Sequence, residues 1–367
     1  MYDGVRRDWR WDQVDDRSWY LAWLVRELKL SRGPVIDQLA GDEEASARAG
    51  EVLESLALAG CEEAREGLRE YVRTGEHWVR VLESVTARWP AEWWADLGEV
   101  ARARIGGEAE PPWAAEPWTR FGIAVRARRF APRPVLDGLD DEELLGLLAD
   151  RATEDDVKVH ALRTLRGRGP AEGLIPLVPG LGTPDGRWPL PALTRAVEDL
   201  GARAVPAARG WARDGRPWLA RLGADVLADH GGPEVLPGLL AKLARQWAAP
   251  GWCGPDRTAR RLARFGPKAA EAVPYLRRFW LVTPHSYERA AYLTALAAID
   301  QGGLDLARAE SLWDCEETAR LLAVATAPDR PGTRGRIVES RDDPSETPEV
   351  RAAARARLAA AGAPPPR

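Results

Sequence analysis

The fold is decided by residues 219–243, which read LARLGADVLADHGGPEVLPGLLAKL. Before the paired glycines, apolar side chains recur three and four positions apart, which places them on one face of a helix: Leu219, Leu222, Val226 and Leu227. A second apolar stripe follows the glycines. Gly231 is expected to end the first helix, because glycine reaches the left-handed C-terminal conformation without a Cβ clash. Pro237 is expected to start the second helix, where its missing N–H costs no hydrogen bond.

This helix–break–helix unit is written four times between about Glu154 and Val282. Each copy has an apolar residue four positions before a glycine, and then a proline: Leu165 to Gly169 with Pro176, Val197 to Gly201 with Pro206, Leu227 to Gly231 with Pro237, and Leu262 to Gly266 with Pro274. The glycines recur every 30 to 35 residues, a period typical of helical repeats. One helix pair cannot bury both of its stripes alone, so neighbouring copies must stack. We therefore expect an all-α fold, an α-solenoid of stacked antiparallel helix pairs.

The pattern Leu-x-x-x-Gly, then an acidic or small residue, then Pro-x-Leu-Leu resembles HEAT repeats of the short type. The resemblance covers residues 154–282 and, more weakly, most of the chain, although longer HEAT repeats have a period of about 40 to 47 residues. Tetratricopeptide and ankyrin arrays have similar periods, but their sequence patterns are absent. Residues 282–298 and the Leu312-Trp-Asp-Cys-Glu-Glu stretch look like those of actinobacterial HEAT-repeat proteins of unassigned role. This resemblance implies a solenoid and carries no function with it.

The chain is expected to divide at a stretch rich in proline and glycine. Residues 1–105 are interpreted as an N-terminal helical block, in which Trp19 and Trp23 form an aromatic cap on the open end of the solenoid. Residues 106–118, GGEAEPPWAAEPW, break every helical period and are predicted to be a loop or hinge. Residues 119–362 are predicted to form the HEAT-like solenoid, and residues 363–367 a frayed tail.

The composition bounds the location and the class of partner. Hydrophobic residues make up 45% and charged residues 29%, as in folded globular proteins. No apolar run reaches the roughly 18 residues of a membrane span, and the charged start of the chain has no apolar core for export, so a cytoplasmic protein is expected. Cys61, Cys253 and Cys315 are far apart and odd in number, which indicates small hydrophobic residues rather than disulfides. A basic middle, residues 113–289, lies between acidic ends.

The sequence contains none of the motifs that would indicate catalysis. Neither a Gly-x-Ser-x-Gly nucleophile elbow nor a phosphate-binding Gly-x-x-x-x-Gly-Lys-Ser/Thr loop occurs. The four histidines are scattered, and the His-Glu repeats of di-iron HEAT hydroxylases are absent, so no metal or cofactor is expected. His285 and Glu288 are spaced i, i+3, a pair that a helix-capping neighbourhood also explains. The absence of these motifs favours a protein that is not an enzyme.

The candidate binding residues form an arginine stripe: Arg257, Arg260, Arg261 and Arg264 recur on one helix face. Arg277 and Arg278 follow on the next helix, and Trp252 and Trp280 lie close by in the sequence. Guanidinium groups bind carboxylates or phosphates bidentately, and aromatic side chains beside them suit a peptide. The alternative interpretation is a solvated outer face in an arginine-rich chain.

These patterns lead to the hypothesis of a non-catalytic, monomeric scaffold that binds the acidic or anionic surface of a protein partner on its concave face. The alternative is a HEAT-like DNA glycosylase or another nucleic-acid repair protein, for which Trp211 with Asp214, or Trp218 with Asp225, are candidates. Nucleic acid is disfavoured by the acidic net charge of −4, because domains that bind it are usually basic. A lyase or a chaperone for a prosthetic group rests on fold analogy alone.

Overall fold

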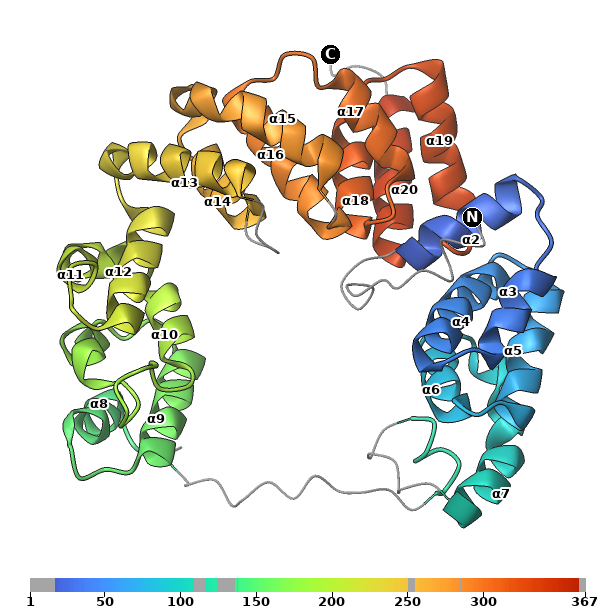
Figure 1. Cartoon of the computed structure of the whole chain (residues 1–367), viewed down its shortest axis with the longest axis horizontal. Coiled ribbons are helices and arrows are strands. Elements are labelled where there is room, and N and C mark those ends of the chain that lie inside the picture. The colour runs from blue at the N-terminus through green and yellow to red at the C-terminus, as the bar shows by residue number, and fades with distance from the viewer. Residues whose placement is uncertain are drawn as a thin grey trace. The chain divides into compact units, whose positions relative to one another are not determined.

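The computed structural model describes residues 17–108, 116–123, 136, 138–249, 255–283 and 285–362. These residues form helices joined by turns and contain no strand (Figure 1), which confirms the all-α prediction. A single isolated β-bridge joins Gly182 and Pro189. The contacts divide the chain into two compact units. Unit 1 comprises residues 1–128 and 276–367, and unit 2 comprises residues 129–275.

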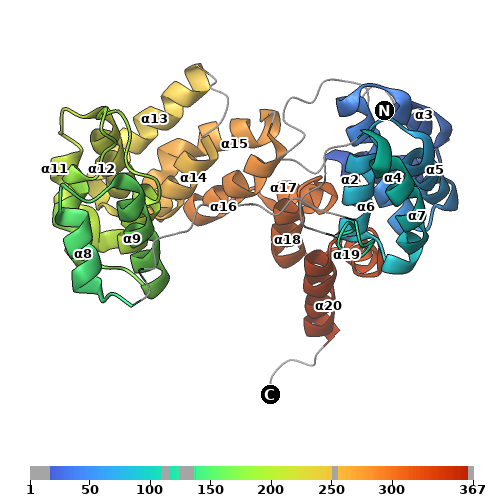
Figure 2. The ribbon, with the colours of Figure 1, turned by 90° about the horizontal axis from the view of Figure 1, so that it is seen from below.

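Unit 2 contains most of the four copies recognised in the sequence. Its helices follow one another as short pairs, and consecutive partners such as α11 and α12 pack side by side (Figures 1 and 2). Its elements, with the first residues of the next helix, are α8 (Asp141–Ala149), α9 (Asp155–Arg168), η5 (Glu172–Gly180), α10 (Leu193–Leu200), η6 (Gly201–Ala204), α11 (Val205–Trp211), α12 (Pro217–His230), η7 (Pro233–Val235), α13 (Leu236–Ala248), α14 (Pro255–Ala263), η8 (Gly266–Ala272) and α15 (Val273–Val282).

Unit 1 joins the two ends of the chain. Its first part contains α2 (Arg17–Glu27), α3 (Gly33–Asp37), η2 (Gln38–Ala40), α4 (Glu43–Leu58), α5 (Glu62–Thr74), α6 (Trp78–Arg88), η3 (Ala91–Trp93), η4 (Ala95–Leu97) and α7 (Gly98–Glu108). Its second part begins within α15 and continues with η9 (Ser286–Glu288), α16 (Arg289–Ile299), α17 (Asp305–Glu310), η10 (Ser311–Trp313), α18 (Glu317–Thr326), α19 (Pro331–Asp342) and α20 (Pro348–Gly362). The predicted tail, residues 363–367, lies outside the described residues.

The predicted helix breaks occur where the glycines stand, although by two different mechanisms. Gly169 and Gly201 have φ values of 125° and 58°, the left-handed region that favours glycine. Gly231 has a φ of −67°, so its backbone could be adopted by any residue. A Cβ added there would lie 2.5 Å from the carbonyl oxygen of Leu227, so glycine is required by space. In the first copy Pro176 lies inside the 3-10 helix η5 instead of starting an α-helix.

The N-terminal core extends past the predicted loop. Trp118 is completely buried in the same apolar cluster as α4 to α7. Its ring lies 6.0 Å from that of Trp78, and its indole N–H donates to the carboxylate of Glu83 at 2.7 Å. Residues 109–115 of the predicted hinge lie outside the described part of the chain. The observed units differ from the predicted division, in which residues 119–362 form one array.

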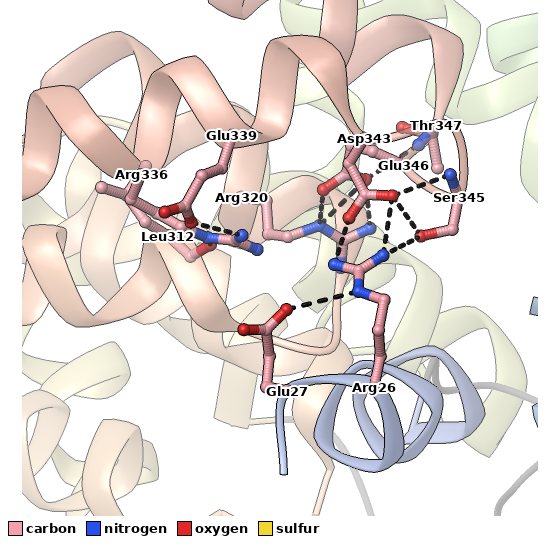
Figure 3. Close-up of polar contacts among 10 residues, drawn as sticks. All are labelled: Arg26, Glu27, Leu312, Arg320, Arg336, Glu339, Asp343, Ser345, Glu346 and Thr347. Carbon is pink, nitrogen blue, oxygen red and sulfur yellow. Dashed lines mark hydrogen bonds and ion pairs between the residues drawn. The ribbon is translucent and has the colours of Figure 1, made fainter. Parts of the chain in front are cut away.

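The aromatic residues of α2, which were predicted to form a cap, contact arginines of the C-terminal helices. The guanidinium of Arg320 lies 3.8 Å from the ring centre of Trp19, and that of Arg336 lies 5.5 Å from the ring of Trp23. Figure 3 shows Arg26 of α2 reaching the carboxylate of Asp343, with its two bonds at 2.7 and 3.0 Å. Cation–π contacts and a bidentate ion pair thus connect the first described helix to the last ones.

Candidate functional site

The arginine stripe of α14 reaches back to the preceding helices of unit 2. Arg261 is buried, with 3% of its side chain exposed, and donates to Asp229 at 2.6 Å and Asp225 at 2.8 Å, both on α12. Arg257 lies 3.4 Å from Asp229 and 3.5 Å from Glu198 of α10. Carboxylates within the chain therefore neutralise these two cations, and most of the surface of Arg261 is covered.

The other two arginines of the stripe are both exposed and differ in their partners. Arg264 donates to the carbonyl oxygen of Gly231 at 2.7 Å and thereby satisfies an open group at the end of α12. Its guanidinium also lies over the ring of Phe265. Among the described residues, Arg260 forms an ion pair only with Asp256 of its own helix, and 60% of its side chain is exposed. Partner binding by the stripe therefore stays a prediction that rests mainly on Arg260.

The remaining predicted binding residues belong to unit 1 or are not described. Arg277 is exposed and donates to a backbone carbonyl in the turn before α17 at 2.8 Å. Arg278 is exposed on the same helix, α15. Trp280 is buried, and the guanidinium of Arg289 lies 5.1 Å from its ring. Trp252 lies outside the described residues. The eight predicted residues are thus divided between the two units.

Unit 2 contains an open cavity between the loop 181–190 and α12, which we call the Trp188 cavity. Its volume is about 410 Å³. Its lining comes from the loop, from the start of α10 and from one face of α12: Arg187, Trp188, Pro189, Thr194, Pro217, Trp218, Arg221, Leu222 and Asp225. Concave sites of this size with apolar walls and a few polar groups are typical binding sites in proteins.

The loop that carries Trp188 is held by backbone hydrogen bonds. The N–H of Thr183 donates to the carbonyl of Trp188 at 2.8 Å, and that of Leu190 donates to Leu181 at 2.9 Å. Between them, Gly186 has a φ of 67° and allows the chain to reverse. The ring of Trp188 projects from this turn with 66% of its surface exposed. A large apolar side chain is thus presented to solvent on an ordered backbone.

The cavity combines aromatic walls with positive charge. Neither Arg187 nor Arg221 forms an ion pair with any carboxylate that the structure describes, and both are exposed. Asp225 also lines the cavity, but its carboxylate accepts a hydrogen bond from Arg261 at 2.8 Å. Trp218 is nearly buried and forms a wall. Residues 181–190 have no helical period, so the sequence did not predict this site, although a tryptophan between Arg187 and a proline was a usable signal.

The two Trp–Asp pairs proposed for a glycosylase have different surroundings. Trp218 and Asp225 line the Trp188 cavity together. Asp214 instead accepts two hydrogen bonds from the guanidinium of Arg216, at 2.8 and 2.9 Å, and these bonds lower its pKa to about 2. Both carboxylates are therefore held by arginine, and the lowered pKa of Asp214 makes that carboxylate a weak base for activating water.

No set of three metal-binding side chains is found among the described residues. His285 and Glu288 are both buried. The carboxylate of Glu288 accepts hydrogen bonds from the hydroxyls of Tyr292 at 2.6 Å and Thr283 at 2.8 Å, so it ties the start of α16 to the preceding turn. This arrangement agrees with the interpretation of the pair as part of a helix start.

A buried acid with a raised pKa occurs in unit 1. Glu54 of α4 is 1% exposed, accepts a hydrogen bond from Ser84 at 2.7 Å and lies 3.2 Å from the guanidinium of Arg88. Burial raises the pKa of Glu54 to about 7, against the attraction of Arg88. The folded chain therefore holds a proton that the unfolded chain, with a pKa of 4.5, has released.

The free energy of unfolding is accordingly expected to fall as the pH rises from about 4.5 to 7, by at most about 1.4 kcal/mol per pH unit. Glu54→Gln removes this ionisation and should make the protein more stable than wild type above pH 7. Urea unfolding of both proteins across this range measures the difference. Glu92→Gln, at an exposed position, is the control. Parallel profiles for wild type and Glu54→Gln would contradict the expectation.

None of the described helices combines the length and the apolar character needed to cross a bilayer. Comparison of the chain with family models, with curated proteins and with solved structures finds no match in any of the three.

Proposed function

We propose that this chain is a non-catalytic scaffold of HEAT-like repeats that binds an acidic segment of a protein partner in the Trp188 cavity. The observation that carries the proposal is the exposed ring of Trp188 beside two arginines, Arg187 and Arg221, that have no carboxylate partner among the described residues. Tryptophan and arginine are the residue types that most often dominate binding energy at protein interfaces.

Contacts that recur at the repeat period support a solenoid of stacked helix pairs. Three arginines each donate to a carbonyl oxygen at the end of a helix 32 or 33 residues earlier: Arg104 to Val72, Arg264 to Gly231 and Arg357 to Val324. Such a bond pairs a carbonyl oxygen that has no partner within the helix, and it fixes the next helix pair against the previous one. The resemblance to short HEAT repeats likewise implies that each helix pair stacks on the pair before it in the sequence.

An acidic partner follows from the charges at the cavity. Arg187 and Arg221 each offer several N–H donors, and a carboxylate can accept two of them side by side. The wall formed by Trp218 and the exposed ring of Trp188 would cover an apolar side chain next to that carboxylate. Because the loop is already ordered by its backbone bonds, little conformational entropy is lost on binding.

Trp188→Ala is expected to weaken the complex by about 2 kcal/mol, or about 30-fold in Kd, because an exposed indole at the centre of the site is lost. Partners recovered with the wild-type chain as bait are produced separately, and their affinity for both proteins is measured by calorimetry. Arg163→Ala, which changes another residue of unit 2 outside the cavity, is the control. Equal affinity of wild type and Trp188→Ala for every recovered partner would reject the proposal.

The glycosylase alternative is favoured by one observation, the presence of Trp218 and Asp225 in the same cavity. It requires release of alkylated purine from duplex DNA, with loss of activity in Asp225→Asn. Base release at excess protein would replace the scaffold proposal. No base release, together with no salt-dependent shift of plain duplex, would exclude the alternative.

A further inference from the structure

A second cavity lies on the other part of α12 and shares Asp225 with the first. We call it the Lys242 cavity. Its volume is about 320 Å³, and it lies between α12, the start of α13 and α14. Its polar lining consists of Asp225, Glu234, Lys242 and Arg261. Because one side chain of α12 lines both cavities, a ligand segment that crosses α12 at Asp225 contacts both.

Lys242 is the cation of this cavity whose charge is not neutralised. It forms no ion pair with a described carboxylate. Asp225, which lines the cavity, and Asp229 on the same helix both bind Arg261. Burial lowers the pKa of Lys242, and the positive charges of Arg261, Arg257 and Arg221 lower it further, against the attraction of Asp225. The ammonium group is therefore held among like charges without a counter-ion of its own.

An anion is the ligand that this arrangement favours. A carboxylate beside Lys242, which is exposed where it lines the cavity, would supply the missing counter-charge. The uncompensated cations Arg187 and Arg221 line the Trp188 cavity, and Lys242 lines the adjoining one. Their charges complement an extended segment with several acidic side chains.

We propose that the Lys242 cavity is a second carboxylate site, so that one acidic segment of the partner crosses α12 and binds both Arg187 and Arg221 in the first cavity and Lys242 in the second. This inference rests on the proposed function and adds to it a requirement: the partner segment is acidic along its length. A charge-assisted hydrogen bond of about 1.5 kcal/mol gives Lys242 about a tenfold share of the affinity.

The contribution of Lys242 to the affinity can be measured because the chain contains few lysines. Only four lysines occur in the sequence: Lys29, Lys158, Lys242 and Lys268. Reductive methylation with ¹³C-formaldehyde labels each of them, and nuclear magnetic resonance then follows the four signals during a pH titration, with and without an oligoglutamate peptide. The pKa of Lys242 should rise by about one unit when the peptide binds, which is the linkage counterpart of a tenfold affinity change. The pKa of Lys268, which lines neither cavity, should not change.

The affinity of a fluorescein-labelled oligoglutamate peptide separates this inference from the proposal on which it rests. Lys242→Met is expected to weaken binding about tenfold, Arg187→Gln to weaken it similarly, and Lys268→Met to leave it unchanged. Weaker binding by Arg187→Gln alone would overturn the second carboxylate site and leave the Trp188 cavity intact. Weaker binding by Lys242→Met alone would overturn the proposal that one segment crosses α12 and binds in both cavities.

Two further outcomes are decisive. Absence of oligoglutamate binding by the wild-type chain would overturn both the second site and the acidic partner. Tighter binding of a single-stranded oligonucleotide than of oligoglutamate, with the same dependence on Lys242, would overturn the protein class of the partner.

Discussion

Glu346→Ala is expected to lower the free energy of unfolding by about 3 to 5 kcal/mol, the cost of leaving a buried charge without its counter-ion. Glu346 accepts from the guanidinium of Arg320 at 2.9, 3.0 and 3.2 Å, and each side chain is 1% exposed (Figure 3). Arg320 also donates to the carbonyl oxygen of Asp314 at 2.9 Å and covers the ring of Trp19. Loss of the carboxylate therefore also loosens the contact between α2 and the C-terminal helices.

Chemical denaturation followed by circular dichroism measures this effect. Asp342→Ala is the matched control, because it removes a carboxylate that is 59% exposed and paired with Arg341, and exposed pairs contribute about 1 kcal/mol or less. The double variant Arg320→Met with Glu346→Leu removes both buried charges and should recover most of the lost stability. Equal losses in Glu346→Ala and Asp342→Ala would contradict the buried-pair argument.

The breaks between helices could be predicted from the sequence because their causes are local. Gly169 and Gly201 end helices through their own backbone conformation, which a nearby proline then complements. Pro206 and Pro237 lie in the first turns of α11 and α13, as predicted. Gly231 also ends its helix as predicted, but not in the expected left-handed conformation: its φ is negative, and the need for glycine there comes from the nearby carbonyl of Leu227.

Contacts between helices that are far apart in the sequence could not be predicted from the pattern of a single helix. The stripe on α14 is one-sided in the sequence, but the acids that bind Arg261 stand 32 and 36 residues earlier, on α12. The position of Arg26 against Asp343 joins residues separated by 317 positions. A helical period indicates which face is polar, and it does not identify what that face contacts. The candidate site was missed for a related reason, since Trp188 lies in a turn that has no period at all.

Gly223 explains how α12, which lines both cavities, lies so close to α11. A Cβ added at this position would lie 2.4 Å from the backbone nitrogen of Ala212 and 2.8 Å from the carbonyl oxygen of Ala208. Those atoms belong to the backbone of the neighbouring helix and its end, so they cannot rotate away as a flexible side chain would. Ala208 itself is completely buried. Small residues on both helices thus set the distance between them.

Gly223→Val is therefore expected to destabilise the protein by about 3 kcal/mol, the upper range for overpacking in a well-packed core. A loss of stability would be informative, because helix propensity alone favours valine over glycine by a few tenths of a kcal/mol. Gly146→Val, in the exposed middle of α8 with open space around it, isolates that small gain and should change stability by about 0.5 kcal/mol or less. Urea unfolding compares the two variants with wild type. Equal stability of Gly223→Val and Gly146→Val would mean that α11 and α12 are not in direct backbone contact, and α12 would then lack the fixed position that both cavities require.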